Sequence, residues 1–376
     1  MKFVVSSSGL LSHLQAISRA IASKSPMPIL DNFLFSLKEQ KLTITASDTE
    51  VTMITTLDPD SVEGEGDIAI PSKILLETLK KFPEQPLNFE IDLETFAVDI
   101  KTDKGKFSVV GQNGEDFPAL PVLNEDKASK LQMPADTLMT GIVKTLFATA
   151  EDELRPVMNG ILFEFTPENM TFVASDSHKL VRYQRLDVKT DYDEASFILP
   201  KKPASLLKNV LPKEGGDVAV AFDDQNAHFT MENYRLVCRL VEGNYPSYNA
   251  VIPQDSPHKV VVDRVDLFNT LGRVSLFASQ ASNLVKLHLA SNEMVVSAQD
   301  IDFSISAHEV LSCQYDGEEM EIGFKSAFLA DILENMSSSD VVIELSDPAR
   351  AGIFVPFDKT DTEDELMLLM PMMING

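Results

Sequence analysis

The sequence has few cysteines, few basic residues and no long apolar run, and each shortage excludes a class of protein. Two cysteines in 376 residues provide neither a disulfide framework nor the spacing of a metal site, and they favour a reducing, cytoplasmic location. No run approaches the ~18 apolar residues of a membrane-spanning helix. The broken apolar stretch at the N-terminus is a poor secretory signal. We therefore expect a cytoplasmic protein without a membrane segment.

Acidic residues greatly outnumber basic ones. The 58 Asp and Glu residues against 32 Lys and Arg residues give a net charge of −26. If this charge were evenly spread, it would oppose binding to nucleic acid, because phosphate contacts need local positive potential. The hydrophobic fraction of 44% is that of a globular protein, and the length suits two or three domains.

One pattern of strand, corner, amphipathic helix and second strand occurs three times. Its corners are Pro71, Pro200 and Phe324, in the segments DIAIPSKILLETLKKF, SFILPKKPASLLKNVL and MEIGFKSAFLADILENM. A second repeated feature is a strand that ends in a small residue and an acid, at Asp48, Asp176 and Asp300. Both features recur at intervals of about a third of the chain, which is typical of an internal repeat.

Each repeat opens with an amphipathic helix and closes with a strand that runs into a turn. Two helices and many short alternating strands per repeat indicate an α+β fold. Polar, proline-containing stretches separate the repeats. We predict three domains, over residues 1–124, 131–253 and 258–376.

The positive charge is concentrated in the expected helices. These span residues 10–24, 72–82, 135–150, 201–213, 264–279 and 325–336, and they hold 13 basic and 5 acidic residues, a net +8. The rest of the chain then carries −34. Lysines favour exposed helix faces in any protein, but equivalent helices at equivalent places in three repeats would form one positive surface. Such a surface suits the phosphate backbone of nucleic acid, without reading of bases.

The motifs of catalysis are weak. Gly64, Gly66 and Ala69 match G-x-G-x-x-A formally, but the glycines precede a strand, which favours a turn. The neighbours Ser175, Asp176, Ser177 and His178 have nucleophilic chemistry but cannot all converge, as a triad requires. The pairs Asp300/Asp302 and Asp191/Asp193 could bind a metal, yet such pairs are common on acidic surfaces. We expect no catalytic residue, no metal site and no cofactor.

The chain ends in ELMLLMPMMING, residues 365–376. Met367–Met370 can be the last strand of the third repeat, and Pro371 is expected to end its pairing, which leaves Met372, Met373 and Ile374 without a following element. Flexible methionines suit binding of several peptides. Burial in the core and docking of a partner are both open for this segment.

Several segments resemble the bacterial DNA polymerase III beta subunits, the sliding clamps. They are MKF at the start, MPIL at 27–30, NGILFEF at 159–165, ASDSHKL, GNYPSY and the terminal MPM, and the similarity runs the whole length. It implies a head-to-tail homodimer of three clamp domains per chain, with helices lining the inner face of a ring and antiparallel sheets outside. Such a ring encircles duplex DNA and tethers the polymerase, and it is not an enzyme.

The resemblance also implies sites. A pocket for short peptides of the polymerase, clamp loader and repair proteins would comprise Met158, Ser175, Ser177, His178, Lys179, Leu180, Pro246, Val251, Leu368, Leu369, Met370, Pro371 and Met372. DNA contacts would fall on Lys24, Lys73, Lys80, Arg155, Lys201 and Lys202. The dimer interface would bring Lys104, Lys106 and Phe107 of one chain to Leu276 and Phe277 of the other.

The sequence departs from the family pattern at several of these places. Ser177 and Lys179 replace the glycine and arginine of the usual corner, T-D-G-H-R-L, and the arginine usual near GNYPSY is absent. Residues 373–376 extend beyond the usual end. Two rival hypotheses are a metal-dependent hydrolase or nucleotidyl enzyme that uses Asp176, His178 and the Asp300/Asp302 pair, and a scaffold that binds peptides but no DNA.

Overall fold

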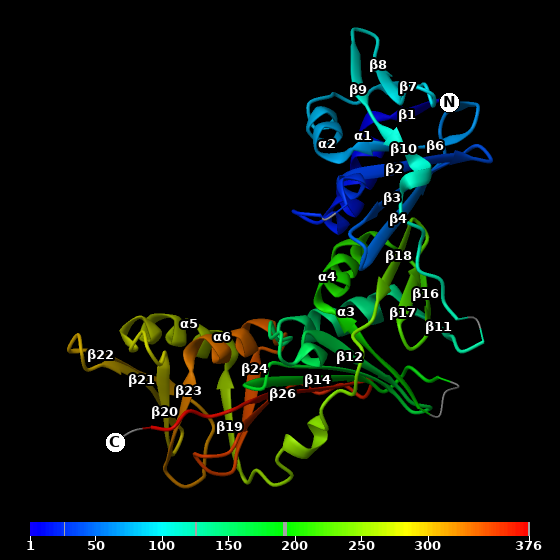
Figure 1. Cartoon of the computed structure of the whole chain (residues 1–376). Coiled ribbons are helices and arrows are strands. Elements are labelled where there is room, and N and C mark those ends of the chain that lie inside the picture. Colours follow the sequence, from blue (N-terminus) through cyan, green and yellow to red (C-terminus); the bar gives the residue numbers. More distant parts are fainter. Residues whose placement is uncertain (26, 125, 191–193, 375–376) are drawn as a thin grey trace. The chain divides into compact units, whose positions relative to one another are not determined.

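The computed structural model describes residues 1–25, 27–124, 126–190 and 194–374 (Figure 1). These residues pack as two compact units, one of residues 1–139 with 202–240 and the other of residues 140–201 with 241–376. The predicted second repeat therefore contributes to both units. None of the described helices combines the length and the apolar character that crossing a bilayer requires.

The six predicted helices are confirmed, with shorter bounds: α1 Ser7–Ile17, α2 Ser72–Leu79, α3 Ala135–Leu146, α4 Lys201–Val210, α5 Arg264–Val274 and α6 Ser326–Asn335. α1 begins earlier than predicted because Ser6 Oγ accepts a hydrogen bond from the amide of Gly9, at 3.0 Å. The predicted last turns of three helices are 3-10 turns, Ser18–Ala20, Leu211–Lys213 and Ser275–Phe277. Such tightening at helix ends satisfies carbonyls that have no helical partner.

Two sheets belong to the first unit. One has the order β5 (Ser61–Glu63), β1 (Lys2–Ser6), β7 (Pro86–Ile91), β8 (Ala97–Lys101) and β9 (Lys106–Val110). The other has the order β10 (Gln112–Asn113), β6 (Gly66–Pro71), β2 (Asn32–Lys38), β3 (Lys41–Ser47), β4 (Val51–Leu57), β18 (Tyr234–Arg239), β17 (Asn226–Thr230), β16 (Asp217–Phe222) and β11 (Ser129–Pro134). Gly64 lies in the turn between β5 and β6 with φ 75°, so the predicted turn is confirmed.

Two further sheets belong to the second unit. The larger has the order β15 (Ala195–Pro200), β12 (Gly160–Phe165), β13 (Met170–Ser175), β14 (Lys179–Arg185), β26 (Glu363–Leu369), β25 (Gly352–Pro356), β24 (Asp340–Leu345) and β19 (His258–Asp263). The smaller has the order β22 (Ile305–Ser312), β21 (Glu293–Asp300), β20 (Leu284–Ala290) and β23 (Met320–Lys325). Figure 1 shows α5 and α6 side by side on the same side of β20, β21 and β23.

Two of the sheets are continuous across repeats. In the first unit β4, which follows the corner at Asp48, pairs antiparallel with β18, the last strand of the second repeat. In the second unit β14, which follows the corner at Asp176, pairs antiparallel with β26, the last strand of the third repeat. The repeats are thus joined by the same kind of strand pair. In the structure of the single chain, the corresponding strands β9 and β22 are the edges of their sheets.

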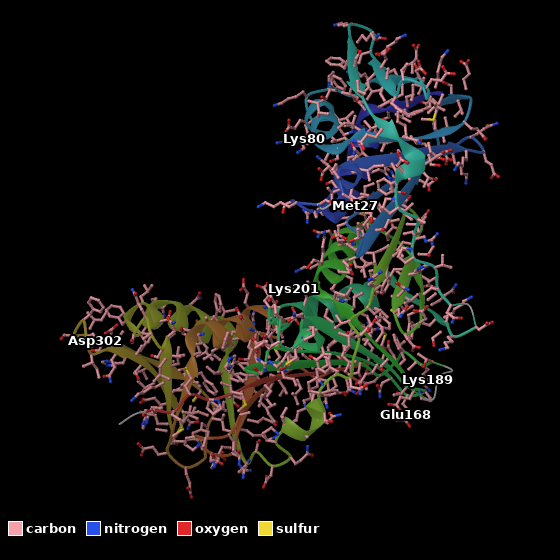
Figure 2. The ribbon with its side chains drawn as sticks, viewed as in Figure 1. Met27, Lys80, Glu168, Lys189, Lys201 and Asp302 are labelled. Atoms are coloured by element: carbon pink, nitrogen blue, oxygen red, sulfur yellow. The ribbon has the colours of Figure 1, made fainter. Side chains whose placement is uncertain are left out.

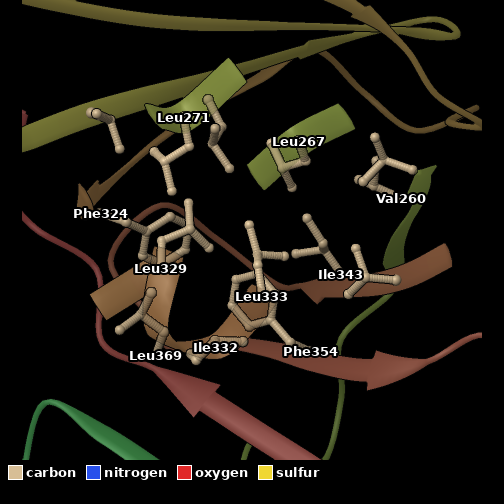
Figure 3. Packing of buried hydrophobic residues seen from close by; sticks show 14 of the residues in the cluster. Val260, Leu267, Leu271, Phe324, Leu329, Ile332, Leu333, Ile343, Phe354 and Leu369 are labelled. Atoms are coloured by element: carbon tan, nitrogen blue, oxygen red, sulfur yellow. The ribbon is translucent and has the colours of Figure 1, made fainter. Parts of the chain in front are cut away.

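Apolar faces of α5 and α6 meet over the strands of the second unit. Figure 3 shows Leu267 and Leu271 of α5 above Leu329 and Leu333 of α6, with Phe354 of β25 below. These side chains are buried. The two leucines of each helix are four residues apart, a spacing that places them on one helical face.

Lys144 does not lie on an exposed helix face as the charge count assumed. It is 9% exposed and Glu365 is 8% exposed, and Lys144 Nζ lies 2.9 Å from Glu365 Oε2 and 3.0 Å from the hydroxyl of Ser337. Burial raises the pKa of Glu365, while the nearby lysine opposes that rise. This pair links α3 to β26 within the second unit.

Lys144→Met is expected to lower the free energy of unfolding by about 3 kcal/mol, because it leaves the Glu365 carboxylate buried without a cation. The double variant Lys144→Met/Glu365→Leu should recover most of the loss. Denaturant unfolding followed by circular dichroism checks this. Lys259→Met breaks an exposed pair with Glu344 and should cost less than about 1 kcal/mol; equal losses in the two single variants would contradict the prediction.

Candidate functional site

The predicted peptide-binding residues centre on the corner between β13 and β14, which Asp176 holds. Its Oδ1 accepts hydrogen bonds from the amides of His178 (2.9 Å) and Lys179 (2.8 Å). Ser175 Oγ donates to the carbonyl of Lys179 at 2.8 Å and accepts from the amide of Ser177 at 3.1 Å. The hydroxyl and this carboxylate oxygen therefore hold the backbone of the turn.

Lys179 ties the corner to helix α6. Its Nζ lies 3.0 Å from Asp176 Oδ2 and 3.2 Å from Asp331 Oδ2. The lysine is buried, so a charge that desolvation would disfavour is held between two carboxylates. Lys179, a predicted site residue, thus holds the corner at Asp176 against helix α6 at Asp331.

Phe328 of α6 completes this region, although the sequence analysis did not select it. The His178 ring stacks on it at 5.4 Å between centroids, and Nζ of Lys179 and of Lys325 lie 4.5 and 4.6 Å from its ring centre. A cation over an aromatic face is attracted by the ring quadrupole. Lys325 ends β23 and caps α6, so it reaches this ring from just before the helix.

The tail strand β26 divides its side chains between two faces. Lys179 pairs with Leu369 and Leu180 with Leu368 across the ladder. Met367 and Leu369 are buried in the core that α6 helps to form, and Figure 3 shows Leu369 beside α6. Leu368 belongs to a separate apolar cluster with Leu180. This alternation is the period of two of a strand. Leu369, predicted in the pocket, is thus a core residue, and Leu368 is buried on the opposite face of the sheet.

The second apolar cluster covers the opposite face of the large sheet. Leu180 and Leu368 pack there with Ile252 and Ile353, and Val157, Val241, Tyr245 and Tyr248 cover them partly. Around it, Met158 is buried, Pro246 and Val251 are exposed, and Met370 is exposed at the end of β26. We call Leu180, Pro246, Val251, Leu368 and Met370 the docking surface. Leu180 and Leu368 belong to this cluster; Pro246 and Val251 are next in the chain to its members Tyr245 and Ile252, and Met370 follows β26.

β26 ends before Pro371, as predicted, but Met372 beyond the proline pairs with another strand, contrary to the prediction. The amide of Met370 donates to the carbonyl of His178 (2.8 Å), and the amide of Met372 donates to the carbonyl of Gly323 in β23 (2.8 Å). A proline only removes its own N–H, and the next amide is free to pair. The tail therefore crosses from β14 to the smaller sheet.

A cavity of about 580 Å³ lies where the tail arrives. It is lined by Met372 and Met373 together with residues of β20, β21 and β22, among them Lys286, Asp300 and His308. The four tail residues beyond the usual family end were an open question. Met373 lies at this cavity and away from the docking surface, and residues 375 and 376 lie outside the described part of the chain.

The residues of the hydrolase hypothesis do not form a metal site. Oδ1 of Asp300 accepts from the amide of Asp302 at 3.0 Å, and no group of three or more His, Cys, Asp or Glu side chains in the described ranges is arranged to hold an ion. Asp191 and Asp193 lie outside the described residues. Among the described contacts, none brings Asp300 or Asp302 to Asp176 or His178.

Four of the predicted DNA-contacting cations are exposed. Lys24, Lys73 and Lys80 have no acidic partner within the described residues, and Lys80 follows the C-terminal end of α2 (Figure 2). Arg155 pairs with Asp152 at 2.9 Å in an exposed loop. These four side chains keep their positive charge in contact with solvent, as a phosphate-binding residue requires.

The other two predicted cations are held by neighbours. Lys201 Nζ lies 2.6 Å from Glu151 Oε1. Lys202 Nζ lies 2.5 Å from Asp48 Oδ2 and donates to the carbonyl of Ala20 at 2.8 Å. Lys202 thus bonds the corner of the first repeat to the helix of the second, which the charge count did not anticipate.

The first part of the predicted dimer interface lies along the edge strand β9. Phe107 is exposed there and packs edge-on against Phe82, with 4.9 Å between ring centroids. Lys104 precedes the strand and is exposed, and Lys106 pairs with Asp99 at 2.9 Å. An edge strand with an exposed aromatic side chain is an incomplete surface.

The second part lies in the third repeat. Leu276 and Phe277 are exposed in the turn after α5, and the hairpin between β21 and β22 adds exposed Ile301, Phe303 (72% exposed) and Ile305. Figure 2 shows Asp302 at the end of this hairpin. The sequence analysis missed the three hairpin residues, although apolar side chains between acids in DIDFSI were a visible signal.

Comparisons with known proteins cover nearly the whole chain. The N-terminal, central and C-terminal domains of the DNA polymerase III beta subunit match residues 1–121, 132–247 and 249–372. The chain belongs to the DNA polymerase III beta subunit family. The beta sliding clamp of Vibrio cholerae is 26% identical, and the alignment covers 99% of this chain and all of the relative. The beta sliding clamp of Synechocystis is 29% identical, and the alignment covers 95% of this chain and 96% of the relative.

Solved structures of beta subunits share the fold. A sliding clamp from Pseudomonas aeruginosa bound to griselimycin superposes with a TM-score of 0.94 at 23% identity, and one from Bartonella birtlesii bound to griselimycin with 0.92 at 25% identity. Both alignments cover all of each chain. The prediction of three clamp domains with antiparallel sheets is confirmed.

Ser177→Gly is expected to stabilise this beta subunit by about 1 kcal/mol, because Ser177 has φ 73°, a left-handed conformation that costs a side chain roughly 1–2 kcal/mol. Thr49, at the same place in the first repeat, has φ 82° and is β-branched, so Thr49→Gly should gain at least as much. Denaturation midpoints measure both. Ser205→Gly within α4 is the control and should lower the stability, because glycine is unfavourable inside a helix. A loss of stability in Ser177→Gly would show that the left-handed conformation of Ser177 is not strained.

Proposed function

We propose that two copies of this chain close head to tail into a ring around duplex DNA and tether the replicative polymerase and other DNA-processing proteins. The observation that carries the proposal is the unfinished pattern of strand pairing. The strand after each corner pairs with the last strand of the next repeat, as β4 does with β18 and β14 with β26. For β22 and β9, the third such pair, the partner has to come from a second copy.

The two edge strands are suited to each other. β9 is the edge of a five-stranded sheet and β22 is the edge of a four-stranded sheet. Pairing β9 with β22 would give a sheet of nine strands, the number in the continuous sheet of the first unit. Phe107 and Val110 are exposed on β9, and Ile305 and Val310 are exposed on β22. Exposed edges with apolar side chains are aggregation hazards unless they are covered. A head-to-tail contact that repeats with the right rotation closes a ring.

DNA binding is proposed to rest on exposed cations without base contacts. Lys24 and Lys80 have no acidic partner among the described side chains and lie in a chain of net charge −26. Isolated phosphate contacts give weak, salt-sensitive and sequence-independent affinity. Tight retention would then come from closure of the ring, and the chain itself would carry out no reaction.

Short apolar peptides of the partner proteins are proposed to bind at the docking surface. Val251 is exposed and precedes Ile252 of the cluster that holds buried Leu180 and Leu368, and exposed Met370 follows β26. Methionine adapts its shape to different apolar partners. Relatives bound to griselimycin support a ligand site in this family.

The ring is tested by reassociating the diluted protein in the presence of nicked circular plasmid. Protein is expected to co-elute with the circle at high salt, since a closed ring needs no ionic contact, and to be lost when a restriction enzyme linearises the plasmid. The matched control is Leu276→Asp/Phe277→Asp, which should give no retention. Equal retention on circular and linear DNA, or none in either case, would refute encirclement.

The docking surface is tested by calorimetric titration with griselimycin. Val251→Glu and Met370→Glu should each weaken binding about tenfold or more, because a charge is placed against an apolar contact. Val122→Glu changes another exposed valine outside this surface and should bind as the wild type does. Unchanged affinity in both site variants would move the ligand site away from this surface.

A further inference from the structure

The turn at Asp48 in the first unit uses each carboxylate oxygen for a different purpose. Oδ1 accepts hydrogen bonds from the amides of Glu50 (3.0 Å) and Val51 (2.8 Å), which closes the corner. Oδ2 faces Lys202, the second residue of α4, at 2.5 Å. One aspartate therefore both shapes its own turn and binds the helix of the next repeat.

The turn at Asp176 in the second unit follows the same rule. Oδ1 closes the corner by accepting from two backbone amides, and Oδ2 binds Lys179, which reaches Asp331 of α6. Here the cation comes from the corner itself and the helix provides an acid. The electrostatic connection between the corner and the next helix is retained.

The turn at Asp300 has only the first half of this arrangement. Oδ1 accepts from the amides of Asp302 (3.0 Å) and Phe303 (3.2 Å), as in the other two corners. Oδ2 has no hydrogen-bond or ion-pair partner within the described residues. Asp300 is 5% exposed, and what remains accessible of it lines the cavity beside the tail. Asp48 Oδ2 and Asp176 Oδ2 each bind a lysine, whereas the equivalent oxygen of Asp300 binds none among the described residues.

The missing cation can be identified from the helices. β15 ends at Pro200 and α4 begins with Lys201 and Lys202; β6 ends at Pro71 and α2 begins with Ser72 and Lys73. Lys73 is thus the counterpart of Lys202. It is exposed and has no acidic partner in the part of the chain that the structure describes.

A second acceptor is also repeated. Lys202 donates to the carbonyl of Ala20, the last residue of a 3-10 turn in which the amide of Ile21 donates to Ser18. The turn Ser275–Phe277 after α5 has the same bond, from the amide of Ala278 to Ser275. Its last residue is Phe277, so the carbonyl of Phe277 corresponds to that of Ala20.

We propose that Lys73 of one copy binds Asp300 Oδ2 and the Phe277 carbonyl of a second copy, and that it is an assembly residue and not a DNA contact. This inference rests on the proposed ring. It reproduces between chains the bonds that Lys202 makes with Asp48 and Ala20 within one chain. It also reassigns a lysine that the family resemblance placed on the DNA surface.

A double-variant cycle tests the pairing. Lys73→Gln and Asp300→Asn each remove a charge, and the asparagine keeps an oxygen to close the turn. We expect each variant to raise the dimer dissociation constant roughly tenfold in sedimentation equilibrium, with no further rise in the double variant. The differences should shrink at high salt. Lys81→Gln, beyond the same helix, is the control and should leave the dissociation constant unchanged.

The outcomes separate this inference from the ring itself. A wild-type protein that stays monomeric at every concentration would refute both. If the wild type dimerises, two results would refute the pairing alone. One is that the effects of Lys73→Gln and Asp300→Asn on the dissociation constant add in the double variant. The other is that Lys73→Gln leaves the dissociation constant unchanged and weakens DNA retention. Cross-linking tests the contact directly. A Lys73→Cys chain mixed with an Asp300→Cys chain should form a covalent dimer with a short bismaleimide, whereas a Lys81→Cys chain mixed with the same partner should not. Absence of the Lys73→Cys product would overturn the contact.

Discussion

Backbone pairing between consecutive repeats is the constraint on which the rest of the structure depends. Each corner aspartate turns the chain so that the following strand, β4 or β14, lies beside the last strand of the next repeat. Because strands in a sheet satisfy each other's amides and carbonyls, an unpaired strand of this kind remains a surface that needs a partner. The assembly proposed here follows from applying one rule to the third repeat.

Ion pairs link the same repeats, and of the three that follow only Lys144 with Glu365 is buried on both sides. Lys144 with Glu365, Lys179 with Asp331 and Lys202 with Asp48 each connect elements of two different repeats. An ion pair in such a place adds specificity of register more than net stability. Cations that a charge count assigns to DNA are therefore partly used to hold the domains together, and the surface left for phosphate is smaller than the sequence suggested.

The repeat, the six helices and the corner strands were predictable because hydrophobic period and turn residues are local properties of the sequence. The partners of the lysines were not, because an ion pair between residues 48 and 202 depends on how two repeats pack. Leu369 was misplaced since its side of the strand is decided by pairing register. Phe328 was missed since it becomes part of the site only when α6 approaches the corner of another repeat.

The continuity of the sheets within one chain has a consequence for how a ring of two copies would open. Strand pairs between repeats of the same chain, such as β4 with β18, are tethered by the backbone, so their effective concentration does not fall on dilution. The joints between copies have no such tether. Dilution, or a protein that opens the ring, would therefore act at the two contacts between copies, while the strand pairs within each chain stay formed.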